Sequence, residues 1–196
     1  TLLQIADKHR VHYDGWGTYY MGDDAINEED DFDDGSGFYE GGTMVALVNL
    51  HPDQKRRVLY ALNYQLPNLI PMCSSIKIED IDDDEIEFVY QGIKFTYVWD
   101  KHTRKAGQSL ETNFKQFFGK SCEQDKAKSL SALDQQGIQT GKPKLGMTKD
   151  GILFAMGRPP IHATFSLDSN TWVYWSNKWS KKVIKFDDKG KVKQIR

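Results

Sequence analysis

The side chains that most often carry out catalysis or bind metals are scattered along this sequence. The five histidines are far apart, except for His9 and His12, and no HExxH or GxSxG segment accompanies them. His9 and His12 could face one way on a helix, but no third ligand stands near them. Neither Cys73 nor Cys122 lies in a pattern typical of a nucleophile. We therefore expect no catalytic site, no metal and no cofactor.

An acidic segment at residues 23–34 is the best candidate for binding a cation. Aligned with an EF-hand loop, it places Asp30 and Asp34 at ligand positions, but Phe32 and Gly41 fall at two others. A solvated acidic loop is the simpler interpretation of such a charge run. The sequence leaves open whether this loop binds calcium.

Aromatic residues flank the acidic segment on both sides. Trp16 and Tyr19 precede it, and Tyr39 follows it. Side chains of this kind could line a groove for an extended basic or proline-rich peptide. They could equally fill the end of a small β domain, which needs large aromatics to build a core. We predict a second contact surface at Trp16, Tyr19 and Tyr39.

A further group of aromatic and basic residues stands near the end of the sequence. Trp175 and Trp179 bracket a turn that contains Lys178. Strand alternation places Trp175 on the face opposite Trp172 and Tyr174, so one face can pack on helices while the other shows an aromatic. Exposed tryptophans are common anchors of protein contacts. We therefore predict that Trp175, Lys178 and Trp179 bind a partner.

Charge divides the chain into two parts. Residues 1–104 contain 9 Lys and Arg against 20 Asp and Glu, whereas residues 105–196 contain 17 against 8, although the whole chain has a net charge of only −2. The basic strands near the end would suit an anionic partner or anionic lipid headgroups. No recognition motif accompanies the charge, so we expect no nucleic-acid partner.

The first half of the sequence is typical of a β domain. Gln91-Gly92 fits a two-residue hairpin turn that pairs Phe88 with Phe95 and places the large side chains of both strands on one face. We predict a small antiparallel β barrel at residues 1–106, built as a five-strand meander. Its expected strands are residues 43–49, 57–64, 75–81, 85–90 and 93–99.

Helical patterns begin after residue 106. We predict a linking helix within residues 107–122, and then an α+β domain at residues 123–196. This domain begins with a helix at 123–136 that ends at Gly137, followed by a short helix with Thr148 as its N-cap and Gly157 as its end. Three strands follow, at 171–175, 182–186 and 191–195. The fold class is therefore α+β, with two domains.

The last third of the chain resembles the SmpA/OmlA family, the small outer-membrane lipoproteins typified by BamE. Those proteins share a helix-helix-three-strand fold with β-lactamase inhibitor proteins. The first half has a fainter resemblance to bacterial SH3-like domains, at Pro71-Met72-Cys73-Ser74. The residues that carry the first resemblance are Gly141-Lys142, Gly146-Met147-Thr148-Lys149, Gly157, Pro159, Thr171-Trp172-Val173-Tyr174, Val183 to Phe186, and Gly190-Lys191-Val192.

The resemblance implies a non-catalytic protein of the bacterial cell envelope that acts through contacts with other envelope proteins. It implies a periplasmic location at the outer membrane, with a lipid anchor upstream of Thr1, and a role in outer-membrane maintenance. No apolar run of the sequence approaches the ~20 residues that cross a bilayer.

Several alternatives stay open at this point. The chain could be a small-molecule, metal or glycan binding module that uses the acidic segment, or an enzyme whose site lies outside known motifs. The sequence does not decide whether Cys73 and Cys122 form a disulfide, since they allow one pairing or two free thiols. It names neither the partner nor the oligomeric state.

Overall fold

The computed structural model describes the backbone of residues 11–13 and 19–21, and residues 35–196 in full. The chain divides into two compact units, Thr1–Phe32 and Asp33–Arg196. In the first unit, β1 (Val11–Tyr13) pairs antiparallel with β2 (Tyr19–Met21). The predicted domain boundaries near residues 106 and 123 fall inside the second unit and stay predictions.

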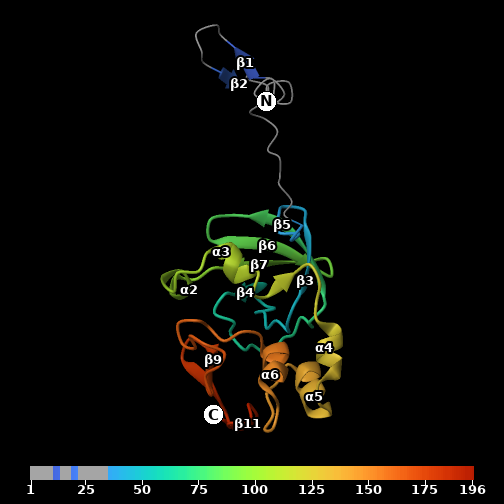
Figure 1. The fold of residues 1–196 in the computed structure, drawn as a ribbon, viewed down its shortest axis with the longest axis vertical. Coiled ribbons are helices and arrows are strands. Elements are labelled where there is room, and N and C mark those ends of the chain that lie inside the picture. Colours follow the sequence, from blue (N-terminus) through green and yellow to red (C-terminus); the bar gives the residue numbers. More distant parts are fainter. Residues whose placement is uncertain (1–10, 14–18, 22–34) are drawn as a thin grey trace. The chain divides into compact units, whose positions relative to one another are not determined.

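The second unit has the predicted α+β class, with a curled six-stranded sheet, a three-stranded sheet and short helices (Figure 1). The strands of the larger sheet lie in the order β4-β7-β6-β5-β3-β8. These strands are β3 (Thr43–Ala46), β4 (Val58–Tyr60), β5 (Ser75–Ile81), β6 (Glu85–Tyr90), β7 (Ile93–Val98) and β8 (Phe118–Gly119).

The β6–β7 hairpin has the predicted register. Phe88 lies opposite Phe95, with ring centroids 5.7 Å apart, and the turn residues Gln91 and Gly92 both have positive φ angles, as a tight two-residue turn requires. The prediction of a wholly antiparallel meander was wrong at β4. This strand pairs with β7 in parallel, because β5 and β6 lie between them in the chain and no hairpin joins the two strands.

The helices are short. They are α2 (Lys101–Lys105), α3 (Leu110–Phe114), α4 (Gln124–Ser129), α5 (Ala132–Thr140) and α6 (Lys149–Met156). Of these, α6 alone has both of its predicted ends, the Thr148 cap and Gly157. The linking helix stops early because the next residues form β8, where Phe118 pairs with Ala46 of β3 and is fully buried.

The predicted single helix at 123–136 is two helices. Leu130 adopts an extended conformation, and the Ser131 hydroxyl then accepts a hydrogen bond from Asp134 N to cap α5. The helix also continues past Gly137. A side chain at this position would collide with Met147, so Gly137 serves close packing rather than helix termination.

The three-stranded sheet consists of β9 (Thr171–Asn177), β10 (Ser180–Phe186) and β11 (Val192–Ile195), in the order β11-β10-β9. Its inner face carries Trp172, Tyr174, Ile184 and Phe186, all fully buried. They pack with residues of α6 and with Met147 in a hydrophobic cluster separate from that of the larger sheet. The second unit therefore contains two hydrophobic clusters, and other contacts must hold them together.

Buried polar side chains make that connection at the end of α6. Asn49 follows β3, and its Nδ2 donates to Ile138 O and Ala155 O while its Oδ1 accepts from Met72 N at 2.9 Å. Asn63 Nδ2 donates to Met156 O at 2.7 Å and to Arg158 O at 2.9 Å. Carbonyl groups that the helix leaves without partners are thereby paired across the two halves.

His51 belongs to the same connection. Its Nε2 lies 3.1 Å from Ala155 O, its Nδ1 lies 3.2 Å from Leu66 O, and the residue is 5% exposed. Burial lowers the pKa of His51, and the two carbonyl contacts offset only part of that effect.

A disulfide between Cys73 and Cys122 links the segment before β5 to the segment after β8. The two cysteines are 49 positions apart in the sequence. Such a bond persists mainly in oxidising compartments.

We predict that Asn49→Ala destabilises the protein by about 2–4 kcal/mol, because it leaves buried carbonyl and amide groups without partners. Urea unfolding monitored by circular dichroism measures the change. Asn68→Ala is the matched control: Asn68 is half-buried and makes one contact of 3.5 Å to Pro52 O. Equal losses for the two variants would contradict the role assigned to Asn49.

Stability should fall as the pH drops below about 6.5, the ordinary pKa of histidine. His51 has a lowered pKa when folded, so the unfolded chain binds this proton more readily and acid favours unfolding. The urea midpoint should therefore decrease from pH 7.5 to 5.5, and decrease less in His51→Gln. His162→Gln is the control for a second histidine with a lowered pKa. An unchanged pH dependence in His51→Gln would refute the prediction.

Candidate binding site at the β9–β10 hairpin

The turn between β9 and β10 presents an aromatic side chain to solvent. Asn177 Oδ1 accepts hydrogen bonds from Trp179 N at 2.8 Å and Ser180 N at 3.0 Å, which fixes the turn. Trp179 is 84% exposed, and Lys178 Nζ lies 5.2 Å from the centre of its ring. The predicted contact residues Lys178 and Trp179 are thus adjacent and accessible.

Trp175 lies on the outer face of the same hairpin, as strand alternation predicts. Trp172 and Tyr174 are fully buried on the inner face, whereas Trp175 is half-buried. Lys181 is its partner across the strand pair, and Lys181 Nζ lies 5.5 Å from the centre of the Trp175 ring. The outer face near the turn therefore combines aromatic surface with positive charge.

A row of rings continues from Trp175 toward α2. The His162 ring lies 5.3 Å from Trp175 and 5.5 Å from His102 between ring centres. These rings border a cavity of about 200 Å³, here called the histidine–tryptophan pocket. It is lined by Leu62, Tyr64, His102, His162, Trp175 and Lys178.

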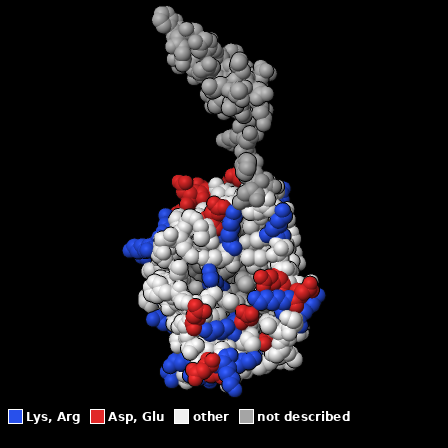
Figure 2. Space-filling view, in the orientation of Figure 1, with Lys and Arg blue, Asp and Glu red and all other residues white. Residues whose placement is uncertain are grey.

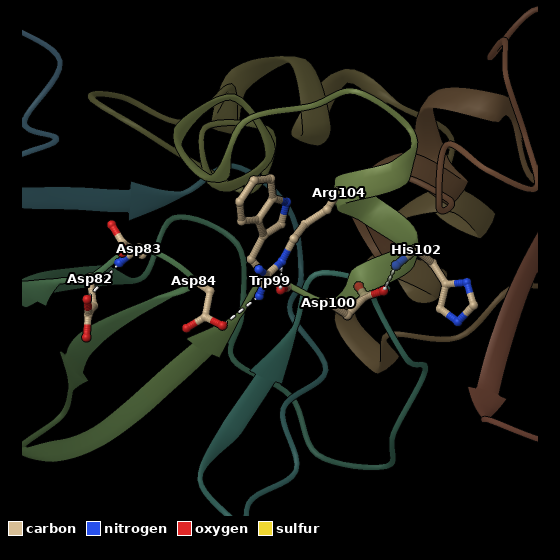
Figure 3. Close-up of polar contacts among 7 residues, drawn as sticks. All are labelled: Asp82, Asp83, Asp84, Trp99, Asp100, His102 and Arg104. Atoms are coloured by element: carbon tan, nitrogen blue, oxygen red, sulfur yellow. Dashed lines mark hydrogen bonds and ion pairs between the residues drawn. The ribbon is translucent and has the colours of Figure 1, made fainter.

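Two sets of hydrogen bonds position the residues that line the pocket. Asp100 caps α2 by accepting from His102 N at 2.7 Å and from Thr103 Oγ1 at 2.7 Å, which positions His102 at the start of the helix (Figure 3). Gln65 N donates to Trp175 O at 2.7 Å and so joins the segment that carries Tyr64 to β9. The pocket depends on contacts between segments distant in sequence.

The electrostatics of the pocket follow from burial and from nearby charges. Burial lowers the pKa of His162, the neighbouring His102 lowers it further, and Asp100 opposes both effects. Burial also raises the pKa of Tyr64, followed by the negative charge of Asp100. His162 and Tyr64 are therefore held toward their neutral forms, whereas Lys178 supplies a positive charge at the rim.

The acidic turn beside α2 is tied to the protein rather than to the pocket. Arg104 Nη2 lies 2.6 Å from Asp84 Oδ2, its Nε donates to Trp99 O, and its guanidinium lies 5.0 Å from the centre of the Trp99 ring. Figure 3 shows this arginine and the His102 imidazole pointing in different directions from α2. Asp82, Asp83 and Asp84 are exposed in the turn between β5 and β6.

A larger cleft of about 440 Å³ lies between the sheet and the helices, with Leu47, Leu153 and Phe154 among its lining residues. Figure 2 shows basic and acidic side chains side by side over α4 to α6. Lys126 Nζ lies 3.4 Å from Glu123 and 3.5 Å from Asp150 at the cleft. Lys126 is thereby paired with both carboxylates that line the cleft.

The second predicted contact surface is only partly described. Tyr39 is half-buried in the turn before β3. Trp16 lies outside the described residues, as does the side chain of Tyr19, and the acidic segment 23–34 is outside them too. The surface formed by Trp16, Tyr19 and Tyr39 stays a prediction.

Sequence reasoning found Trp175 and Lys178 but missed the rest of the pocket. His102 and His162 are 60 positions apart in the sequence and share no motif, and Tyr64 follows a different strand. Asp100 as an N-cap before α2 was the one local signal available for placing His102.

Within residues 35–196, no three His, Cys, Asp or Glu side chains come together in a way that could hold a metal ion. No helix in that range is both long and apolar enough to cross a bilayer.

Comparison with known proteins gives no family for this chain. No protein-family model matches it, and no solved structure matches it. A regulator of ribonuclease activity B from Shewanella denitrificans is 60% identical over 30 residues, which are 15% of this chain and 22% of that protein. A protein of the same name from Shewanella amazonensis is 58% identical over 33 residues, 17% of this chain and 20% of the relative. The chain thus spans about a fifth of the length of these curated relatives.

Trp179→Ala should change the free energy of unfolding by less than about 0.5 kcal/mol, because the side chain is exposed. Trp172→Ala should cost about 3–5 kcal/mol, since it empties a fully buried site in the same hairpin. Thermal and urea unfolding of both variants measure this contrast. A large loss in Trp179→Ala would mean that this side chain supports the fold and is not available for a partner.

Proposed function

We propose that the protein is a non-catalytic adaptor of the bacterial cell envelope, a lipoprotein or periplasmic protein that binds another envelope protein. The observation that carries the proposal is the exposed turn of the β9–β10 hairpin. There Trp179 is 84% exposed, Lys178 stands against its ring, and Trp175 lies on the same outer face. An exposed tryptophan with basic neighbours is the kind of anchor that dominates protein contacts.

Two further observations support the envelope location. The Cys73–Cys122 disulfide suits an oxidising compartment such as the periplasm. Two helices, α5 and α6, precede a three-stranded antiparallel meander, which is the element order of the SmpA/OmlA proteins. In this proposal residues 123–196 are BamE-like, the larger sheet is SH3-like, and the protein acts at the outer membrane.

Charge favours an acidic partner surface. Lys181 and Lys185 of β10 point to the outer face together with Trp175, and Arg196 lies opposite Val183 on that face. None of the three strands contains an acidic residue. The nearest carboxylates in sequence, Asp187 and Asp188, lie in the turn after β10. The proposed partner therefore offers acidic residues around a site for Trp179.

Cross-linking in the native envelope tests this function. The full-length protein with Lys178→Glu and Trp179→Ala should lose at least tenfold of its cross-links to a defined envelope protein, identified by mass spectrometry. The matched control is Lys77→Glu with Phe165→Ala, which changes an exposed lysine and a phenylalanine that is 86% exposed, both elsewhere on the surface. Loss in both variants, or in neither, would contradict the hairpin as the contact site. Cross-links to anionic lipid alone would replace the protein partner by a membrane surface.

The alternative function is a small-molecule, metal or glycan binding module that uses the acidic segment 23–34. That segment lies entirely outside the described residues. A calcium titration followed by melting temperature tests its calcium form, because a ligand that binds only the native state raises stability. An unchanged melting temperature at millimolar calcium would discard it.

A further inference from the structure

We propose that the histidine–tryptophan pocket binds a carboxylate that is attached to an aromatic or other apolar group. If the carboxylate belongs to a partner protein, the inference rests on the proposed function and adds a second contact to it. Binding of a free acid would stand independently of any partner.

The walls of the pocket suit a flat apolar group. The rings of His102 and His162 are inclined by 31°, as are those of His162 and Trp175, so the three rings form a continuous surface. Leu62 adds an aliphatic side chain. A volume of about 200 Å³ is below the range of about 300–1,000 Å³ typical of drug-sized ligands. The pocket therefore fits a group the size of one large side chain.

Polar side chains without hydrogen-bond partners line the same space. Within residues 35–196, the side chains of Tyr64, His102 and Lys178 make no hydrogen bond to the protein. His162 Nδ1 has no partner either, but it is inaccessible to solvent and is not counted among the donors. A carboxylate would accept hydrogen bonds from the Tyr64 hydroxyl, an imidazole N–H and the Lys178 ammonium, which are donors for its two oxygens.

The charges favour a singly charged anion. No carboxylate lines the pocket, and Lys178 stands at its edge with Lys181 on the adjoining strand. Asp100 is near enough to influence His162 and Tyr64, but its oxygens already accept from the start of α2. Its negative charge would oppose a doubly charged phosphate more strongly than a carboxylate, and no arginine offers the forked donors that phosphate sites commonly use.

The pocket lies beside the turn of the proposed contact hairpin. Trp175 and Lys178 line it, whereas Trp179 does not. A partner segment that packs on Trp179 could therefore place an acidic or carboxyl-terminal residue into the pocket. This arrangement separates two contacts that variants can remove one at a time.

Nuclear magnetic resonance titration of the full chain tests the inference. Phenylacetate is compared with phenylacetamide, which has the same ring but no charge, by following the Trp175 indole and the imidazoles of His102 and His162. A peptide that ends in phenylalanine is compared with its amidated form in the same way. We expect saturable shifts with at least tenfold tighter binding of the charged member of one or both pairs.

His102→Gln, which changes an exposed residue of α2, should reduce that preference at least threefold without unfolding the protein. Trp179→Ala should leave phenylacetate binding unchanged while it abolishes capture of the envelope partner. Tighter binding of the peptide would assign the carboxylate to a protein terminus, and tighter binding of phenylacetate would assign it to a small molecule. Equal binding of acid and amide, or shifts equally large in His102→Gln, would overturn the pocket. Partner capture that survives in Trp179→Ala would instead overturn the proposed function.

Discussion

The structure of residues 35–196 depends on how the carbonyl groups at the end of α6 are satisfied. A helix that ends inside a protein leaves its last carbonyls without partners, and burying them unpaired would cost several kcal/mol. Here the partners come from the larger sheet and its loops: Asn49, His51 and Asn63. Tyr174 of the smaller sheet adds its hydroxyl to Gly157 O at 2.8 Å. Neither half alone supplies all the hydrogen-bond donors for these carbonyl groups, so the two halves stabilise one another.

The same connection shapes the candidate site. Gln65 donates through its side chain to Met156 O and through its backbone to Trp175 O, so it links the end of α6 to the outer hairpin. Tyr64 is its neighbour in sequence and lines the histidine–tryptophan pocket. The turn with Trp179 extends beyond this supported region. A rigid base with an exposed aromatic at its tip is suited to binding, because little ordering entropy is lost at the base.

Local patterns in the sequence predicted much of the fold. Alternation along 85–98 and the Gln91-Gly92 turn gave the correct hairpin and register, and the Thr148 cap gave α6 almost to the residue. The predictions failed where distant contacts override local preference: β4 pairs in parallel with β7, and Gly137 continues a helix because Met147 packs against it. The sequence did not predict the pocket for the same reason, since His102 and His162 meet only after the two halves join. Trp175 and Lys178 were predictable because alternation and a turn are local.

Native-state hydrogen exchange at residue resolution tests the central claim most directly, namely that α6 makes the two sheets one cooperative unit. The amides of Phe88 in β6 and Ile184 in β10 lie in the centres of the two sheets, and both residues are fully buried. If the halves depend on each other, both amides should exchange only through global unfolding, with free energies that agree within about 0.5 kcal/mol. Exchange of Ile184 at a free energy several kcal/mol below that of Phe88 would show that the smaller sheet opens by itself, and would contradict the account.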